Sequence, residues 1–355
     1  MNKAAMKDWS KAEWVDPAYN WKPAPVSDLP PRVLIDFATK CNLRCGMCPV
    51  WGSDDDAAID SVEGLMPLEN ARRLLDEISA VKPLVHPCLY GEPLLAPHLK
   101  DHIKQAKANG MPFAMNTNGL ALTEEMAQFL VDEKVDSIMF SIDAVTRETL
   151  KKIRGIKKLE RIEKAVFLML KVRGDSEFPR VGVSFTIQEP NKHEVDAFIT
   201  RWVGVVDVVR TGLVFEDGKF TKLTAPKERV ACPVLYKTMP VHNDGTVTLC
   251  CLDGMRTTNM GNVFKTSVRD VWQGEEFSKV RYFHETKQWE KVPFCNTCNG
   301  WAQYAYEEEV RDGLLIRRSP EFSYYNKIAR LTNWQGSLLG GHEPPPKDLV
   351  QRSAA

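Results

Sequence analysis

From residue 32 onward the chain alternates between two hydrophobic patterns. Short runs of apolar and β-branched residues are followed by longer stretches in which apolar residues recur every three or four positions, as Ala71, Leu74, Leu75 and Ile78 do. The short runs predict strands and the longer stretches predict helices. The predicted strands are 32–39, 84–90, 112–118, 137–144, 180–188 and 206–214, and the predicted helices are 68–80, 98–109, 123–134, 160–173 and 193–203.

This alternation is typical of βα units on a parallel sheet. Six such units predict an α/β fold, a partial (βα)6 TIM-like barrel over residues 32–214, whose chemistry is expected at the C-terminal ends of the strands. Residues 1–31 carry Trp9, Trp14 and Trp21 among several prolines. We expect this N-terminal extension to have little regular structure and to cover the barrel surface.

After the barrel the pattern changes. Residues 215–300 contain an Asp244-Gly245 turn between two short extended runs, which predicts a hairpin, and a helical stretch around 267–283. We therefore predict a small C-terminal α+β domain over 215–300. Residues 301–334 have a helical pattern, so 301–355 is expected to be a C-terminal helical segment with a loose, proline-containing tail.

Composition narrows the class of protein. Apolar residues make up 43% and charged residues 26% of the 355 residues, as in ordinary globular proteins. Lys+Arg and Asp+Glu are both 47, so no overall field favours nucleic acid or an anionic membrane. The N-terminus has no signal-peptide pattern, and no apolar run has the length of a membrane span. These features predict a cytoplasmic protein, in which nine cysteines favour metal ligation over disulfides.

Three cysteines directly follow the first predicted strand. Cys41, Cys45 and Cys48 have the spacing C-x3-C-x2-C. Three thiolates on one loop can ligate three irons of a 4Fe–4S cluster and leave the fourth iron open, whereas a cluster usually takes four cysteines. An open iron is a catalytic position. A zinc knuckle or three unrelated core cysteines are the alternatives, although structural zinc sites use four ligands.

This spacing after a first strand resembles that of the radical S-adenosylmethionine (radical SAM) enzymes. In that family the amino and carboxylate groups of S-adenosylmethionine (SAM) chelate the open iron, and one electron splits SAM into methionine and a 5′-deoxyadenosyl radical that abstracts hydrogen from the substrate. Gly91-Glu92-Pro93 also resembles the family segment that binds the amino group of SAM. The SAM contacts that the resemblance implies are Met47, Gly91, Glu92, Asn118, Ser141 and Arg154.

These implied contacts have a chemical rationale. Gly91 lets the backbone approach closely, and Arg154 offers a planar fork to a carboxylate. The family pattern places Ser141 near the ribose and Asn118 in the turn after the third strand. Met47 stands where the family often has an aromatic residue near the adenine. An ordinary strand-to-helix turn at Gly91 and a solvated Arg154 are the simpler alternatives.

A second cysteine set, Cys232, Cys250, Cys251, Cys295 and Cys298, lies in the C-terminal domain. It resembles that of the SPASM/Twitch subfamily, in its shorter version with one auxiliary 4Fe–4S cluster. The family spacing favours Cys250 over Cys251, since adjacent strand residues point in opposite directions. Cys251 is then a hydrogen-atom donor or a buried thiol. A structural zinc site is the alternative for the set.

The resemblance implies a radical SAM oxidoreductase in which the auxiliary cluster takes the second electron from the substrate. A sugar- or aminocyclitol-like small molecule would be oxidised or epimerised, with an external electron donor such as flavodoxin or ferredoxin. A peptide-modifying SPASM maturase and a non-catalytic metal-binding module are the alternatives. Residues 1–31 are too few for a peptide-recognition domain, which favours the small molecule.

Other polar residues are candidates for the substrate side of the barrel. Strand alternation would place His86, Cys88 and Tyr90 on the same face as Glu92. The candidate bases for a substrate hydroxyl are His86, Tyr90 and His242. Further candidate contacts on the fifth and sixth strands are Ser184, Thr186, Gln188 and Arg210.

Overall fold

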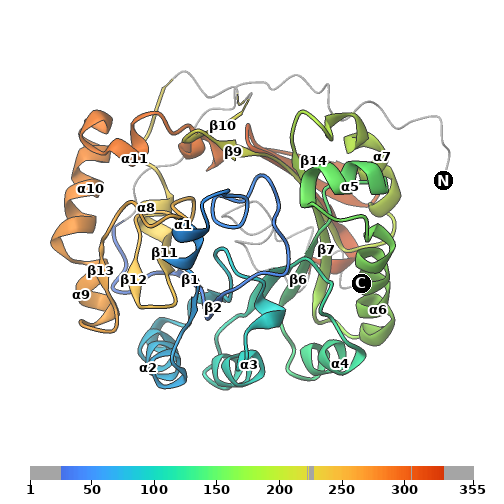
Figure 1. Cartoon of the computed structure of the whole chain (residues 1–355), viewed down its shortest axis with the longest axis horizontal. Coiled ribbons are helices and arrows are strands. Elements are labelled where there is room, and N and C mark those ends of the chain that lie inside the picture. The colour runs from blue at the N-terminus through green and yellow to red at the C-terminus, as the bar shows by residue number, and fades with distance from the viewer. Residues whose placement is uncertain (1–24, 222, 224–227, 305, 332–355) are drawn as a thin grey trace.

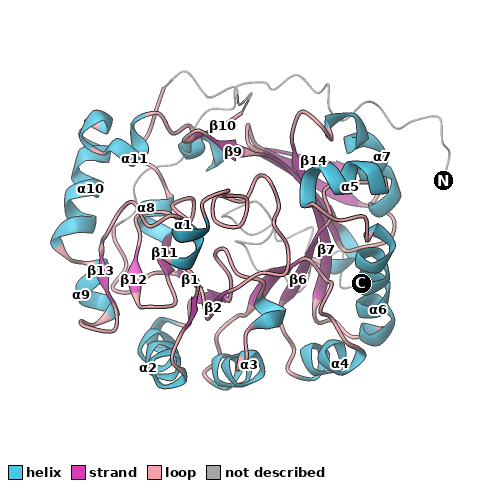
Figure 2. Cartoon of the chain, in the orientation of Figure 1, coloured by secondary structure: helices cyan, strands magenta, loops and turns pink. Residues whose placement is uncertain are grey.

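In the computed structural model, parallel strands curve around one interior and helices lie on the outside (Figures 1 and 2). The structure describes residues 25–221, 223, 228–304 and 306–331. β1 pairs with β4, and β5, β6, β7 and β8 pair in succession, all in parallel. A bridge between Val85 and Phe113 joins the two groups. The predicted partial barrel is confirmed, and among the described residues its outer edges do not pair, so it stays open. The strands of the two main sheets are β1 (Arg32–Ile35), β4 (Leu84–His86), β5 (Ala114–Thr117), β6 (Ser137–Ser141), β7 (Arg180–Ile187), β8 (Val208–Leu213), β11 (Thr238–Val241), β12 (Thr246–Val247), β13 (Gly261–Asn262), β14 (Glu307–Arg311), β15 (Leu314–Arg318) and β16 (Phe322–Lys327).

The helices form where the sequence places an apolar stripe or a cap. In α2 the predicted stripe from Ala71 to Ile78 is buried. One helix of the barrel, α5, was not predicted; it is capped by the Thr146 hydroxyl at its start and by Gly155 in the left-handed conformation at its end. The helices are α1 (Asp56–Asp60), α2 (Leu68–Ile78), α3 (Leu99–Ala108), α4 (Glu124–Asp132), α5 (Arg147–Arg154), α6 (Leu159–Arg173), α7 (Val195–Trp202), α8 (Val234–Lys237), α9 (Val268–Trp272), α10 (Glu275–Glu285) and α11 (Pro293–Asn296).

No helix in the described ranges combines the length and the hydropathy that a bilayer crossing requires. Two short strand pairs lie outside the main sheets. They are β2 (Ala38–Thr39) with β3 (Gly64–Leu65), and β9 (Phe215–Glu216) with β10 (Lys219–Phe220). The tryptophans predicted to anchor the N-terminal extension lie outside the described residues.

The predicted strand 84–90 is shorter than expected. β4 ends at His86, because Pro87 has no backbone N–H to offer a sheet ladder. Alternation of side chains therefore does not continue to Tyr90 and Glu92, and the shared face predicted for His86, Cys88, Tyr90 and Glu92 is wrong. Tyr90 instead donates a hydrogen bond of 2.6 Å to the carbonyl of Cys251.

The prediction of helix for 301–334 is wrong, because most of its described part is a β-meander. β16 pairs antiparallel with β8, and β15 and β14 continue the same sheet. Asp312 and Gly313 both have positive φ, as a tight hairpin turn between β14 and β15 requires. Cross-strand ion pairs, such as Arg318 with Glu309, link the neighbouring strands of this meander.

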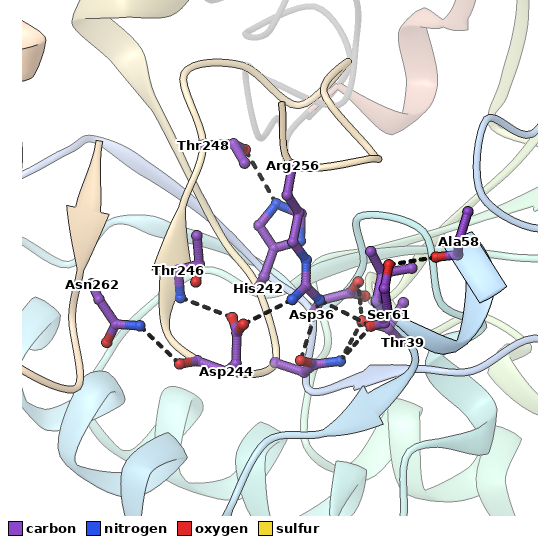
Figure 3. Close-up of polar contacts among 12 residues, drawn as sticks. Asp36, Thr39, Ala58, Ser61, His242, Asp244, Thr246, Thr248, Arg256 and Asn262 are labelled. Atoms are coloured by element: carbon purple, nitrogen blue, oxygen red, sulfur yellow. Dashed lines mark hydrogen bonds and ion pairs between the residues drawn. The ribbon is translucent and has the colours of Figure 1, made fainter. Parts of the chain in front are cut away.

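The predicted Asp-Gly hairpin is confirmed, and it joins the C-terminal region to the barrel. β11 pairs in parallel with β1, and β12 turns back on it. Figure 3 shows the polar contacts around the turn, in which Arg256 donates to Asp244. Asn243 donates to the Thr39 hydroxyl at 2.8 Å and to the Val62 carbonyl at 3.0 Å. Thr39 in turn donates to Asp36 at 2.7 Å, so the contacts reach the first strand.

Asn243→Ala is expected to lower the free energy of unfolding by about 1–3 kcal/mol, since it removes a buried amide and leaves the Val62 carbonyl without this donor. Thermal melting followed by circular dichroism measures the change. Asn259→Ala is the matched control, because Asn259 is exposed and accepts one hydrogen bond from the Gly261 N–H. Equal losses in melting temperature for the two variants would contradict the role assigned to Asn243.

Candidate metal centres and active site

The loop that carries Cys41, Cys45 and Cys48 follows β2 directly. It turns back on itself through hydrogen bonds from the Cys48 N–H to the Cys45 carbonyl and from the Gly52 N–H to the Cys48 carbonyl, both 2.9 Å. The Cys48 sulfur accepts from the Trp51 N–H at 3.3 Å. All three cysteines are free thiols. The sequence pattern thus becomes one compact loop with three sulfur donors.

Burial shapes the chemistry of these thiols. It raises the pKa of Cys41 to about 12 and raises the pKa of Cys45 and Cys48, and the mutual repulsion of the three groups adds to the shift of Cys41. Without a bound cation the sulfurs are therefore protonated at neutral pH. Bound iron supplies positive charge and favours thiolates, so this donor set fits an iron–sulfur cluster.

Arg154 lies at the end of α5 and reaches the cysteine loop. Its Nη2 donates to the Asp143 carboxylate at 2.6 Å, and its Nη1 lies 3.8 Å from the Cys45 sulfur. Arg154 is only 7% exposed, so the alternative of a solvated residue is wrong. Its buried Nε has no hydrogen-bond partner in the described part of the chain and remains a free donor beside the loop.

Glu92 is buried next to the end of β5. Its carboxylate accepts hydrogen bonds from the Thr117 hydroxyl at 2.6 Å and from the Asn118 N–H at 2.8 Å. Burial raises the pKa of Glu92, although these hydrogen bonds and Arg154 oppose the shift. The Asn118 side chain donates to Asn42 at 2.7 Å, within the cysteine loop. Glu92, Asn118 and the loop are thus in one hydrogen-bonded assembly.

Gly91 is held against the first strand by Asp36, a residue that the sequence did not single out. The Asp36 carboxylate accepts from the N–H groups of Gly91 at 3.2 Å and Leu89 at 3.3 Å. Asp36 is fully buried, and this burial raises its pKa. A Cβ atom on Gly91 would lie 1.9 Å from the Ala38 carbonyl oxygen. Only glycine fits this backbone approach.

The remaining predicted SAM contacts, Met47 and Ser141, have different surroundings. Met47 is half-buried and packs against the main hydrophobic core. Ser141, at the end of β6, accepts a hydrogen bond of 3.5 Å from Ser184 on β7. Asp143 follows two residues later with a positive φ, and it joins β7 by accepting from the Thr186 N–H at 2.6 Å. An acid just past a strand end was the signal that could have identified Asp36 and Asp143.

Four cysteines of the second set line one small pocket together with Arg229 and Trp301. The Cys298 sulfur accepts from the Gly300 N–H at 3.3 Å. Burial raises the pKa of three of the thiols, to about 12 for Cys295. The cysteines that share this pocket are Cys232, Cys250, Cys295 and Cys298.

Arg229 is fixed at the edge of this pocket by two backbone carbonyls. It donates to the Cys295 carbonyl at 2.6 Å and to the Asn296 carbonyl at 3.0 Å. These bonds hold the guanidinium beside the pocket. Its positive charge there opposes the rise in pKa that burial causes at Cys295 and Cys298, and so favours their thiolate forms.

Cys251 does not line this pocket, but its thiol is close to that of Cys250. The two residues lie beyond the end of β12, so the strand alternation that we expected to separate them does not apply. A hydrogen bond between the thiols raises the pKa of Cys250 and lowers that of Cys251. The choice of Cys250 as the ligand stays a prediction, now supported by the shared pocket.

No group of three or more His, Cys, Asp or Glu side chains in the described part of the chain is arranged to hold a single metal ion. Cysteines on a 4Fe–4S cube bind four different irons and stand farther apart than four ligands of one ion. The shared loop of the first cysteine set and the shared pocket of the second therefore support cluster ligation.

The predicted bases each contact a different part of the chain. The His86 ring contacts the Ala114 carbonyl at 2.7 Å, and burial lowers its pKa to about 3. The His242 ring contacts the Thr248 hydroxyl at 3.2 Å in the C-terminal hairpin, and burial lowers its pKa to about 4. Both imidazoles are neutral at neutral pH. Among the described residues, no hydrogen bond links His86, Tyr90 and His242 to one another.

Comparison with known proteins matches two families to the chain. Residues 35–200 match the radical SAM superfamily, and residues 232–299 match SPASM, an iron–sulfur cluster-binding domain. A tungsten-containing aldehyde ferredoxin oxidoreductase cofactor-modifying protein of Pyrococcus furiosus is 23% identical over 75% of this chain and 86% of its own length.

Two solved structures have a similar fold. BtrN in complex with AdoMet and 2-DOIA has a TM-score of 0.52 and 18% identity, over 76% of this chain and 93% of BtrN. Native anSMEcpe with bound AdoMet and Cp18Cys peptide has a TM-score of 0.55 and 13% identity, over 75% of this chain and 87% of anSMEcpe. The first match includes Cys41, Cys45 and Cys48 and the second includes the second cysteine set, so the chain carries a radical SAM domain followed by a SPASM domain.

Proposed function

We propose that the chain is a radical SAM oxidoreductase that acts on a sugar- or aminocyclitol-like small molecule and completes an oxidation or an epimerisation with one auxiliary 4Fe–4S cluster. One observation carries the proposal. Arg154 approaches Cys45 in the cysteine loop, and the hydrogen-bonded Glu92–Asn118 assembly is bonded to the same loop. When bound, the first cluster and SAM would supply a 5′-deoxyadenosyl radical, with an electron from a donor such as flavodoxin or ferredoxin.

The residues of the chain would bind and orient SAM. Glu92 is buried beside the loop, where an ammonium group would favour its ionised form. The free Nε of Arg154 is available to the carboxylate of SAM, while Asp143 holds the guanidinium in place. Gly91 lets the backbone approach, and Cys41, Cys45 and Cys48 would hold the cluster. Met47 and Ser141 remain proposed contacts for the adenine and ribose.

The second cysteine set would hold the auxiliary cluster. Cys232, Cys250, Cys295 and Cys298 share one pocket, and Arg229 places a positive charge beside it. Such a cluster could accept the second electron from the substrate, which oxidation requires. Zinc in this pocket would remove that role, because zinc has no redox chemistry.

Two relatives favour a small substrate. The Pyrococcus furiosus protein is named for modifying a cofactor, and the BtrN structure contains 2-DOIA. A peptide is the second candidate, since anSMEcpe with its bound peptide has a similar fold.

Anaerobic reconstitution followed by reduction with SAM tests the proposal. We expect about eight irons per chain, as two 4Fe–4S clusters require. We also expect 5′-deoxyadenosine whose yield rises with a sugar or aminocyclitol substrate. A preparation with both clusters that does not cleave SAM would disprove the radical function, and a rise seen only with peptides would favour the maturase.

Cys232→Ala and Cys298→Ala separate the two cluster roles. We expect each variant to keep part of its SAM cleavage while losing substrate oxidation, because only the auxiliary cluster loses a ligand. 5′-Deoxyadenosine and oxidised product are measured in the same reaction by liquid chromatography. Equal loss of both products would indicate that the second cysteine set has a structural role.

A further inference from the structure

A row of polar side chains crosses the interior face of the barrel sheet. Ser141 on β6, Ser184 on β7, Arg210 on β8 and Tyr324 on β16 are successive register partners. Register partners on neighbouring strands have side chains on the same face. Tyr324 packs in a small hydrophobic cluster with Met139 from β6, separate from the core beneath the helices. The row therefore faces the barrel interior, next to this cluster of apolar side chains.

Arg210 is the only cation among these four residues, and Arg317, which continues the row on β15, pairs with Glu308. Its Nε donates to the Tyr324 hydroxyl at 3.0 Å, and its guanidinium lies 5.5 Å from the centre of the Phe322 ring. Among the described residues it makes no ion pair with a carboxylate within hydrogen-bond distance. The terminal nitrogens of this inward-facing arginine are available to an acceptor.

Glu321 lies beside Arg210, in the turn that leads into β16. The Ser319 hydroxyl accepts from the Glu321 N–H at 3.3 Å, and the Glu321 carbonyl accepts from the Leu213 N–H at 2.9 Å. The backbone of Glu321 is thus fixed against β8. Its side chain is 7% exposed, and its Oε2 is buried without a hydrogen-bond partner among the described residues.

An unpartnered buried carboxyl is costly to a folded protein. Burial raises the pKa of Glu321 to about 8, although Arg210 opposes the shift and Cys251 adds to it, and the positive charge of a bound ammonium group would favour the ionised carboxylate. Arg210 in turn interacts with Asp143, the partner of Arg154. Glu321 thus interacts electrostatically with Cys251 of the SPASM domain, and Arg210 with Asp143 beside the cysteine loop, so the pair is coupled to both cysteine sets.

We propose that Glu321 and Arg210 bind the substrate, Glu321 accepting from an amine or hydroxyl and Arg210 donating to a hydroxyl or carbonyl oxygen, so that the site takes an amino polyol. This inference rests on the proposed function for the position of the reacting carbon. The β-meander, which was not predicted from the sequence, thus contributes the carboxylate of Glu321 to the proposed substrate site.

Glu321→Gln tests the site, with Glu308→Gln as the matched control in the same meander. Glu308 is exposed and pairs with Arg317, the register partner of Tyr324, so this control removes a carboxylate from the same face of the sheet without altering Glu321 or Arg210. Glucosamine is the probe, and its binding to the reconstituted full chain is measured by saturation-transfer NMR. We expect binding by the wild type and by Glu308→Gln, and at least about a tenfold loss in Glu321→Gln, as expected for a lost charge-assisted hydrogen bond.

The melting temperature separates binding from a structural role. Because the carboxyl has no partner for Oε2, Glu321→Gln is expected to melt at the wild-type temperature or above it. A lower melting temperature, unchanged glucosamine binding, or no binding by the wild type would each overturn the inference. SAM cleavage by the same wild-type preparation tests the proposed function separately: cleavage without glucosamine binding defeats only the substrate site, and binding without cleavage defeats only the radical function.

Discussion

Cys45→Ala is expected to abolish SAM cleavage and to lower the iron content from about eight to about four per chain, since a 4Fe–4S cluster with two protein ligands is not retained. Cys45 is the most buried of the three loop cysteines and the one that Arg154 approaches. The auxiliary cluster has its own ligands and is expected to stay. Iron is measured by colorimetric assay after anaerobic reconstitution, and 5′-deoxyadenosine by liquid chromatography.

Cys88→Ser is the matched control for this prediction. Cys88 is also a free thiol near the loop, but its sulfur donates to the Gly91 carbonyl at 2.9 Å, a bond that a serine hydroxyl can replace. We expect this variant to bind the wild-type amount of iron. Full iron in Cys45→Ala, or a loss of half the iron in Cys88→Ser, would show that the ligands have been assigned wrongly.

The barrel could be predicted from the sequence because its strands and helices are local patterns. Each predicted strand corresponds to an observed one, and the stripe of α2 is buried as predicted. The cysteine loop could be found for the same reason, since its three sulfurs are close together in sequence. Local patterns are what hydrophobic periodicity and motif spacing record.

The contacts that complete the site join distant segments, and no local pattern records them. Arg154 pairs with Asp143 eleven residues away, and Asn243 reaches Thr39 from the C-terminal hairpin. Glu321 was missed because residues 301–334 were predicted to be helical, whereas Asp312-Gly313 is a hairpin turn and the charged residues of 307–318 lie on two paired strands. The charged residues were cross-strand partners rather than neighbours on a helix.

Gly91→Ala is expected to weaken SAM binding by at least about tenfold and to destabilise the fold by about 1–3 kcal/mol, the usual cost of forcing extra atoms into a packed site. The new Cβ would lie 1.9 Å from the Ala38 carbonyl oxygen, which belongs to the backbone of β2 and cannot rotate away. Relief requires the 89–92 segment to move, which would displace Glu92 from Thr117 and Asn118. Equilibrium dialysis with labelled SAM measures the affinity.

Gly46→Ala is the matched control, because Gly46 lies within the cysteine loop and a Cβ atom there meets nothing within 4 Å. The same added methyl group is therefore expected to leave both SAM affinity and melting temperature near their wild-type values. If Gly46→Ala lost as much affinity as Gly91→Ala, loop flexibility would explain the loss. If neither lost affinity, the close approach of Gly91 to β2 would not be what places Glu92 for SAM.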